Sequence, residues 1–423
     1  MDKYQLTKLS NGIPVLLLPQ EHTRAVSLFV TAKVGSRYEN PKISGISHFI
    51  EHLMFKGTKK RPDKEMLAKE LDSIGANFNA FTGKDRTVYF ITANHKHLAQ
   101  IQDILADMVQ ASLFPEKELA PEKKVVIEEI NMYEDNPMMS IEDFLENLVF
   151  GDNALGRDIA GTVKTVSGIT HKDVLNYYRK YYQSGNYLLV LTGNFKVAEA
   201  KKMLEEYWGK LPAKPRQNYN KIVVKSVKPQ FVVKHKDTQQ IQLALGFPGI
   251  DYNHKDAVAA QILALILGGN MSSRLFLEIR EKRGLCYLVR AYHNFYEDNG
   301  MLVVQAGLDK SRLEEAVQAI LGELKKIATV KVSAEELKKA KSFLEGKFSI
   351  ETESARQLAS WYSTQITFMK KVVTPDEYLK MVNKVSVDDI KRVASFFFKN
   401  NKLNLAMIGD VPKLPWKNIL KFD

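Results

Sequence analysis

The sequence predicts an α+β protein of two homologous domains, each a mainly antiparallel sheet packed with helices. Its 423 residues exceed what a single hydrophobic core usually organises, which favours two domains. Stretches of alternating polar and apolar residues, typical of strands, are not separated by regular single helices, and this disfavours a doubly wound parallel sheet. An internal repeat indicates that one unit has been duplicated.

The clearest repeat joins "ITHKDVLNYYRKYYQSGNYLLVLTGNF" (169–195) to "VSVDDIKRVASFFFKNNKLNLAMIGDV" (385–411), which match without a gap. Each copy predicts an amphipathic helix, begun by Thr170 or Ser386, and then a strand. The equivalent positions include Asp173 with Asp389, Gly193 with Gly409, and the inward-facing pairs Tyr177, Tyr181 and Val393, Phe397.

A looser match pairs "LDSIGANFNAFT" with "REKRGLCYLVRAY", where a helix would end at Gly75 or Gly284 before a strand begins. Between the two halves, a stretch containing proline, lysine and asparagine predicts a linker. We therefore expect three parts: a first domain at 1–212, a linker at 213–228 and a second domain at 229–423.

The composition argues against several classes of function. The net charge is +12, but the lysines are interspersed with acids, as in "EELKKAKSFLEGK", so nucleic-acid binding is not expected. No apolar run reaches the roughly 18 residues of a membrane span, and no signal or transit peptide is visible. The single cysteine, Cys286, excludes an internal disulfide and a thiolate-rich zinc site, and it suits a reducing, cytoplasmic location.

The stretch "SHFIEHLMF" (47–55) places two histidines and a glutamate within five positions. On a helix, His48, Glu51 and His52 lie on one face within about one turn. Two imidazoles four residues apart can supply two zinc ligands, and a carboxylate beside them can act as general base. The competing interpretation is an amphipathic helix whose polar groups are satisfied without a metal.

A catalytic zinc needs a third protein ligand and an open position for water. The stretch "PEKKVVIEEINMYEDNP" predicts a second helix that has Pro121 in its first turn and offers Glu122, Glu128 and Glu129 as candidate ligands. Glu122 and Glu129 lie two turns apart on one face, whereas Glu128 is rotated by about 100°. From the spacing alone, each of them could equally be a solvated surface glutamate.

These motifs resemble the inverzincin family that includes pitrilysin, insulin-degrading enzyme and the mitochondrial processing peptidases. "GISHFIEHLMFKGT" resembles the family's signature helix, and "EKKVVIEE" resembles the segment that carries its third ligand. The resemblance covers essentially the whole chain. It implies one zinc per chain held by His48, His52 and Glu129, with Glu51 as the catalytic base and Glu122 supporting the site.

The resemblance also implies a way to bind substrate. "GANFNAFTGKDRTVYF" is similar to a family strand whose edge pairs with the peptide backbone, which implicates Asn79, Ala80 and Phe81. "LGGNMSSRLFLEIREKRGLCY" is similar to a segment whose arginine and tyrosine contact substrate, here Arg280 and Tyr287. Without the resemblance, the first segment would be interpreted as an ordinary core strand, and Arg280 as a solvated residue at the end of a helix.

The duplication predicts that the second half binds no zinc, because Ala259, Ile262 and Leu263 occupy the positions of the first-half motif. The glycines of "LGGN" lack the residues of a phosphate loop and are interpreted as a helix end.

The function expected from this reading is that of a zinc metalloendopeptidase hydrolysing peptides or unstructured polypeptides. In larger relatives a chamber is enclosed by two halves, so a chain of this length would form a homodimer or pair with a zinc-less paralogue. The alternative function is a non-catalytic scaffold or core subunit of the same family.

Overall fold

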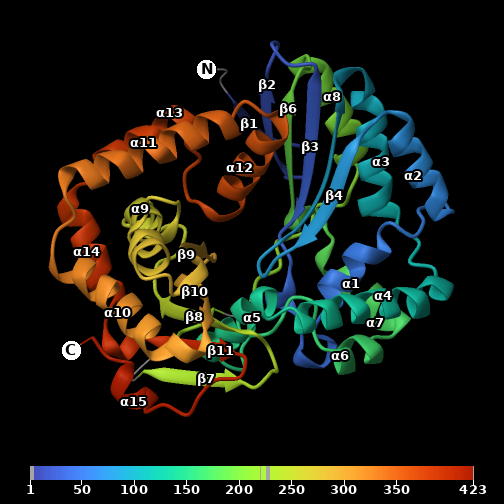
Figure 1. Cartoon of the computed structure of the whole chain (residues 1–423). Helices are drawn as coiled ribbons and strands as arrows, with labels where there is room; N and C mark the ends of the chain where they lie inside the picture. The colour runs from blue at the N-terminus through green and yellow to red at the C-terminus, as the bar shows by residue number, and fades with distance from the viewer. Residues whose placement is uncertain (1–3, 220, 225–228, 423) are drawn as a thin grey trace. The chain divides into compact units, whose positions relative to one another are not determined.

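The computed structural model describes residues 4–219, 221–224 and 229–422, which fold into two compact units. Unit 1 comprises residues up to 131 together with 158–220 and 349–372. Unit 2 comprises 132–157, 221–348 and 373 to the C-terminus. Each unit contains one β-sheet packed with helices (Figure 1). In the described ranges, no helix is long and apolar enough to cross a membrane.

Five strands of each sheet have the same topology, which agrees with the predicted duplication, and the sheet of unit 1 has β1 as an additional edge strand. Neighbouring strands are antiparallel except for one parallel pair in each sheet, β2 with β6 and β7 with β11. In spatial order, the sheet of unit 1 contains β1 (Gln5–Lys8), β2 (Pro14–Pro19), β6 (Tyr187–Gly193), β3 (Ala25–Ala32), β5 (Thr87–Asn94) and β4 (Asn77–Thr82). The sheet of unit 2 contains β7 (Gln230–Lys234), β11 (Asn404–Ile408), β8 (Gln240–Pro248), β10 (Gly300–Asp309) and β9 (Cys286–Phe295).

The helices follow the same order in the two halves. The first half contains α1 (Ile46–Leu53), α2 (Lys64–Ser73), α3 (Leu98–Ala111), α4 (Glu116–Asp135), α5 (Pro137–Phe150), α6 (Val163–Gly168), α7 (His171–Tyr181) and α8 (Val197–Trp208). The second half contains α9 (Ala257–Gly268), a π-helix (Phe276–Lys282), α10 (Leu313–Thr329), α11 (Ala334–Glu351), α12 (Ala355–Phe368), α13 (Pro375–Lys384), α14 (Val387–Phe397) and α15 (Trp416–Ile419).

The repeated helix and strand are present in both units. Both helices, α7 and α14, begin with a capping box, in which Thr170 pairs with Asp173 and Ser386 with Asp389. The strands β6 and β11 follow them. The looser repeat is present too, because Gly75 and Gly284 both adopt positive φ, +60° and +57°, two positions before the first residues of β4 and β9.

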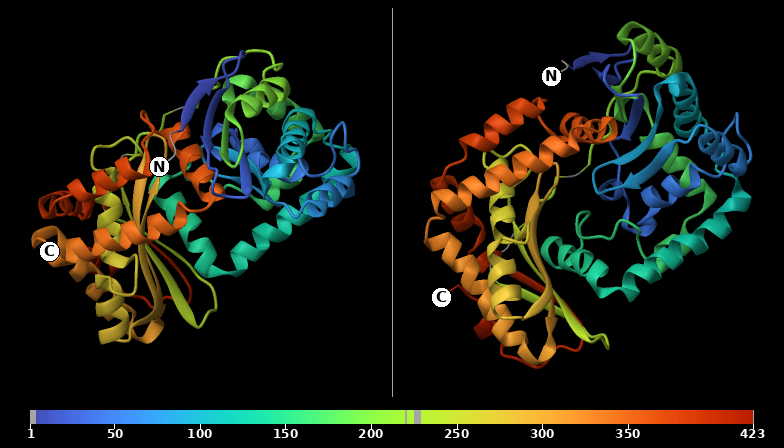
Figure 2. Two further views of the ribbon diagram at one scale, coloured as in Figure 1. Left: turned by 90° about the horizontal axis from the view of Figure 1, so that it is seen from above. Right: turned by 45° about the horizontal axis from the view of Figure 1, so that its top comes forward.

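Both faces of each sheet are buried, as their continuous apolar runs require. In β2, the side chains of Val15 and Leu17 pack into the core formed with α3, α7 and α8. Leu16 and Leu18 point to the opposite face, where α12 covers them. In unit 2, α9, α10 and α14 cover one face of the sheet and α5 covers the other (Figure 1, Figure 2).

The two halves of the sequence therefore exchange a helix. The first-half helix α5 packs in unit 2, where Ile141 and Leu145 belong to the same buried apolar cluster as Ala244 and Met301. The second-half helix α12 packs in unit 1. The compact units thus differ from the contiguous domains expected from the sequence. An apolar stripe shows that a helix face is buried, but it does not specify which sheet buries it.

The division at 213–228 stays a prediction. Residues 213–219 and 221–224 form no helix or strand, and the rest of this stretch lies outside the described residues.

Candidate active site

The candidate site begins with α1, whose N-terminus is held by a buried carboxylate. Glu39 accepts hydrogen bonds from the backbone N–H groups of Gly45 and Ser47, each at 2.8 Å. A negative charge at this end of a helix is favourable. Gly45 adopts φ +95°, and a Cβ there would lie 2.4 Å from the carbonyl oxygen of Ala160, so this turn requires glycine. These contacts fix where the helix starts and which way its side chains point.

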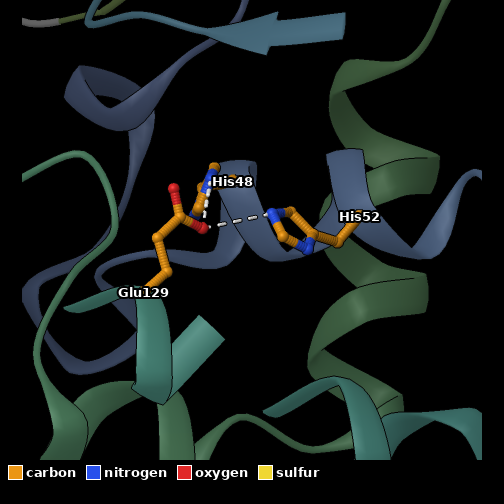
Figure 3. A group of neighbouring side chains, drawn as sticks. All are labelled: His48, His52 and Glu129. Carbon is orange, nitrogen blue, oxygen red and sulfur yellow. Dashed lines mark ion pairs between the residues drawn. The ribbon is translucent and has the colours of Figure 1, made fainter. Parts of the chain in front are cut away.

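Two histidines of α1 and one glutamate of α4 converge on a single point (Figure 3). Their candidate ligand atoms all lie within 4.8 Å of one another. The nearer carboxylate oxygen of Glu129 lies 3.6 Å from His48 Nε2 and 3.5 Å from His52 Nε2. All three side chains are partly exposed, Glu129 by 31%. The group is therefore reachable from solvent.

These distances fit a metal better than they fit hydrogen bonds. A good N–H···O hydrogen bond is about 2.7–3.2 Å long. Ligands placed about 2.0–2.2 Å from a tetrahedral zinc lie about 3.3–3.6 Å from one another. Two imidazole nitrogens and one carboxylate oxygen are also the donor set of known catalytic zinc sites. The three side chains thus fit a zinc ion with a fourth position open.

The other ring nitrogen of His52 is held by Glu122. His52 Nδ1 lies 2.8 Å from Glu122 Oε1, and the second oxygen of that carboxylate lies 2.5 Å from Lys56 Nζ. A histidine that donates its remote N–H to a carboxylate has its tautomer and ring orientation fixed, so Nε2 is free for a metal. His48 differs, because its Nδ1 is buried and has no hydrogen-bond partner among the described residues.

Glu51 lies on the same helix and is 9% exposed. Its Oε2 accepts a hydrogen bond of 2.6 Å from the hydroxyl of Thr82, at the end of β4. Burial raises the pKa of the Glu51 carboxyl above its ordinary value, and the Thr82 hydrogen bond opposes this rise. A buried carboxylate with a raised pKa is a stronger proton acceptor than an exposed one.

The protonation states of His48, His52 and Glu129 depend on one another. Burial and the neighbouring His52 lower the pKa of His48 to about 4, so this ring is neutral. Burial would lower the pKa of His52 as well, but the contacts with Glu122 and Glu129 outweigh it and raise that pKa to about 9. The same contact with His52 lowers the pKa of Glu129. Metal ligation requires neutral imidazole, so a zinc ion would displace a proton from His52.

One expectation about α4 was wrong. The helix begins at Glu116, and Pro121 lies inside it rather than in its first turn. The residues before Pro121, "EKELA", are good helix formers, and the proline removes only one backbone hydrogen bond. The relative orientation of the glutamates is as expected. Glu122 and Glu129 both face α1, whereas Glu128 is exposed.

The strand expected to bind substrate is at an edge of its sheet. β4 pairs only with β5, so one side of it is free of strand partners in the described sheet. Asn79 and Phe81 are exposed and Ala80 is buried between them. An edge strand of this kind can accept an extended peptide, and its link to Glu51 through Thr82 places it beside the site.

Arg280 and Tyr287 belong to unit 2, where they lie together. The Arg280 guanidinium is 4.9 Å from the centre of the Tyr287 ring and 4.6 Å from that of Phe276. Tyr287 is 75% exposed, which is unusual for an aromatic side chain at the start of a strand. Their substrate-binding roles stay predictions.

Unit 2 has an apolar counterpart of the candidate metal site. Ala259, Ile262 and Leu263 on α9 are all buried and cannot ligate a metal. α9 ends at Gly268 with Gly269 as its C-terminal cap, as expected for "LGGN".

Two residues of the site were missed from the sequence. Lys56 lies one helical turn beyond His52, so its i+4 spacing from that histidine could have indicated it. Thr82 gave no signal, because its contact with Glu51 joins a strand to a helix 31 positions away.

Known proteins resemble this chain along nearly its whole length. Residues 15–163 match the family model "Insulinase (Peptidase family M16)", and residues 168–344 match "Peptidase M16 inactive domain". An uncharacterized zinc protease of Rickettsia bellii is 34% identical, over 96% of this chain and 98% of its own. An uncharacterized zinc protease of Bacillus subtilis is 33% identical with the same coverage.

Solved structures share the fold. The crystal structure of a protease from Helicobacter pylori matches 96% of this chain and 100% of its own, with a TM-score of 0.90 and 25% identity. A "peptidase M16 inactive domain" from Pseudomonas fluorescens matches 97% of this chain and 98% of its own, with a TM-score of 0.89 and 19% identity. These matches confirm the predicted α+β fold with two homologous parts.

Proposed function

Because the chain belongs to the insulinase family, peptidase family M16, we propose that it is a zinc-dependent endopeptidase that cleaves peptides or unstructured polypeptides inside an enclosed chamber. Membership of this family confirms the resemblance noted in the sequence. The observation that carries the proposal is the convergence of His48, His52 and Glu129 on one point, with Glu51 beside them. All four residues lie in the part of the chain that matches the insulinase model.

The proposed ligands are His48, His52 and Glu129, one zinc per chain. When bound, zinc supplies a Lewis acid that polarises the scissile carbonyl and lowers the pKa of a water molecule. Glu122 holds His52 in the tautomer that leaves Nε2 free. The neutral His48 needs no proton removed before it ligates.

Glu51 is the proposed general base. Thr82 occupies its Oε2, so Oε1 is left to take a proton from the attacking water. The water oxygen then bonds to the carbonyl carbon. Glu51 returns the proton to the nitrogen of the scissile bond as the C–N bond breaks, and the leaving group departs as a neutral amine. Burial, which raises the pKa of Glu51, suits both transfers.

The proposed substrate contacts come from β4 and from the Arg280 and Tyr287 pair. An extended peptide would add to the free edge of β4 at Asn79, Ala80 and Phe81. Arg280 and the Tyr287 hydroxyl offer donors that suit the oxyanion developing on the cleaved carbonyl. Only flexible, unfolded chains would fit such a chamber.

We propose that the chamber is completed by a second copy of the chain. One chain contains both the candidate zinc site and the Arg280 and Tyr287 pair, so a homodimer would be sufficient. Pairing with a zinc-less paralogue is the other arrangement. A cytoplasmic location is proposed from the single cysteine.

Metal analysis separates this proposal from the scaffold alternative. Purified protein should carry about one zinc per chain, and its peptide hydrolysis should stop with a chelator and return with zinc. A scaffold would carry well under one zinc per chain. Mass-spectrometric mapping of cuts in a mixed peptide library then reports the sequence preference.

A further inference from the structure

Lys56 contacts Glu122 beside the candidate metal site, but it is neither a proposed zinc ligand nor a proposed catalytic residue. Glu122 is a buried carboxylate, 4% exposed, and such a group is costly to bury without partners for both oxygens. The two oxygens have different partners. Oε1 is 2.8 Å from His52 Nδ1 and Oε2 is 2.5 Å from Lys56 Nζ. The Glu122 carboxylate is therefore held from two sides and its plane is fixed.

The backbone at Lys56 is fixed as well. After α1 ends at Leu53, the turn continues, and the Lys56 N–H donates to the Leu53 carbonyl at 3.0 Å. The next residue, Gly57, adopts φ +132°, and its carbonyl accepts from the N–H of Leu113 at 3.0 Å.

An ion-pair network centred on the buried Arg61 anchors the residues that follow. Thr58 N–H donates to the Arg61 carbonyl at 2.7 Å, and Arg61 pairs with Asp107 at 3.0 Å and with Asp103 at 2.8 Å. Lys56 thus extends from an anchored segment rather than from a mobile loop. Its ammonium position relative to Glu122 is correspondingly well defined.

We propose that Lys56 is a positioning residue for His52. It acts through Glu122: the ammonium fixes the carboxylate, and the carboxylate fixes the imidazole with its proton on Nδ1 and its Nε2 directed at the metal position. This inference rests on the proposed zinc function. Partners behind a metal-ligating histidine typically change metal affinity about 10- to 100-fold when they are removed.

The test measures zinc affinity by competition with a chromophoric chelator, in the full-length protein. Lys56→Met removes the charge and keeps the length of the side chain, and it should weaken zinc binding at least about tenfold. Lys56→Arg keeps a cation and should restore most of that loss. The matched control is Lys59→Met, an exposed lysine three positions away, which should bind zinc like the wild type.

A double-mutant cycle shows whether Lys56 acts through Glu122. In a Glu122→Gln background, Lys56→Met should change zinc affinity by less than about threefold, because the carboxylate it holds is gone. An unchanged affinity in Lys56→Met, or an equal loss in both backgrounds, would overturn the inference. Wild-type protein that binds no zinc would instead overturn the proposed function, together with the role of Lys56 that rests on it.

Discussion

The hydroxyl of Thr82 donates a 2.6 Å hydrogen bond to Oε2 of Glu51, which joins the last residue of an edge strand to the proposed catalytic base. The strand is the one proposed to take up substrate, and the base lies on the helix that carries both histidines. Among the described residues, Thr82 forms no hydrogen bond with any of the three proposed zinc ligands. Its contribution to the reaction can therefore be separated from metal binding.

Replacing Thr82 by valine should slow peptide hydrolysis and leave the zinc content unchanged. Valine keeps the shape of the side chain but cannot donate, so the Glu51 carboxylate is free to rotate. A hydrogen bond to a charged group contributes about 1.5–3 kcal/mol, which corresponds to a loss of at least about tenfold in kcat/KM. The hydrogen bond also lowers the pKa of Glu51, against the effect of burial. Its loss should therefore raise that pKa, and the acidic limb of the rate profile should move to higher pH.

Thr82→Ser is the matched control for this effect. Serine retains the hydroxyl and should keep at least about a third of the wild-type rate. If the valine and serine variants are equally slow, the loss comes from packing at the end of β4 and the hydroxyl does not position Glu51.

A buried histidine in unit 2 predicts acid sensitivity of the fold. Both ring nitrogens of His293 are buried without a hydrogen-bond partner among the described residues, and the ring packs against Phe295 and Phe397. Burial lowers the pKa of His293 to about 3, below the ordinary value of 6.5. As the pH falls, His293 is therefore protonated in the unfolded chain before it is protonated in the folded protein. The fold loses stability as the pH falls from about 6.5 toward 3.

The magnitude follows from the linkage relation. Between pH 7 and pH 5, His293 should reduce the free energy of unfolding by about 2 kcal/mol, measured by urea unfolding at each pH. His293→Leu should remove this part of the pH dependence, whereas the exposed His22, changed to leucine, should leave it intact. An identical pH dependence in His293→Leu and the wild type would show that this ring is not what makes the fold sensitive to acid.

The proposed homodimer predicts complementation between two inactive variants. If Arg280 and Tyr287 serve the zinc site of the other subunit, Glu51→Gln and Tyr287→Phe proteins should recover activity when they are mixed. Random pairing of equal amounts gives heterodimers in about half of the dimers, each with one intact site, so activity should approach about a quarter of the wild type. The variants are assayed with an unstructured peptide after subunit exchange has been demonstrated.

Two preparations of Glu51→Gln mixed together provide the control and should stay inactive. A mixture of the two variants that shows only the sum of their separate activities would rule out the shared site. Tyr287 would then act within its own chain or have no catalytic role.

Much of the candidate site could be read from the sequence because its geometry is local to two helices. The spacing of His48 and His52 and the seven-residue interval from Glu122 to Glu129 each fix a helix face, whatever the tertiary structure. The contacts that were missed are of another kind. Lys56 reaches α4 and Thr82 reaches α1 across the fold, and only the packing of elements brings these side chains together.

The fold was predictable to the same degree. The repeated helix caps and the glycines before β4 and β9 are local signals, and they occur at the expected positions. The exchange of α5 and α12 could not be predicted, because the sequence of an amphipathic helix shows which face is buried but not which sheet it packs against. The expected start of α4 was wrong, because the five helix-forming residues before Pro121 extend the helix and the proline removes only one of its backbone hydrogen bonds.

The most direct test of the central claim is the rate at which Glu51→Gln protein hydrolyses an unstructured peptide, with its zinc content measured in the same sample. Glutamine keeps the shape and the Thr82 contact but cannot take up a proton, so zinc should remain near one per chain while the rate falls at least about a hundredfold. A Glu51→Gln protein that carries its zinc and cleaves at the wild-type rate would contradict the account.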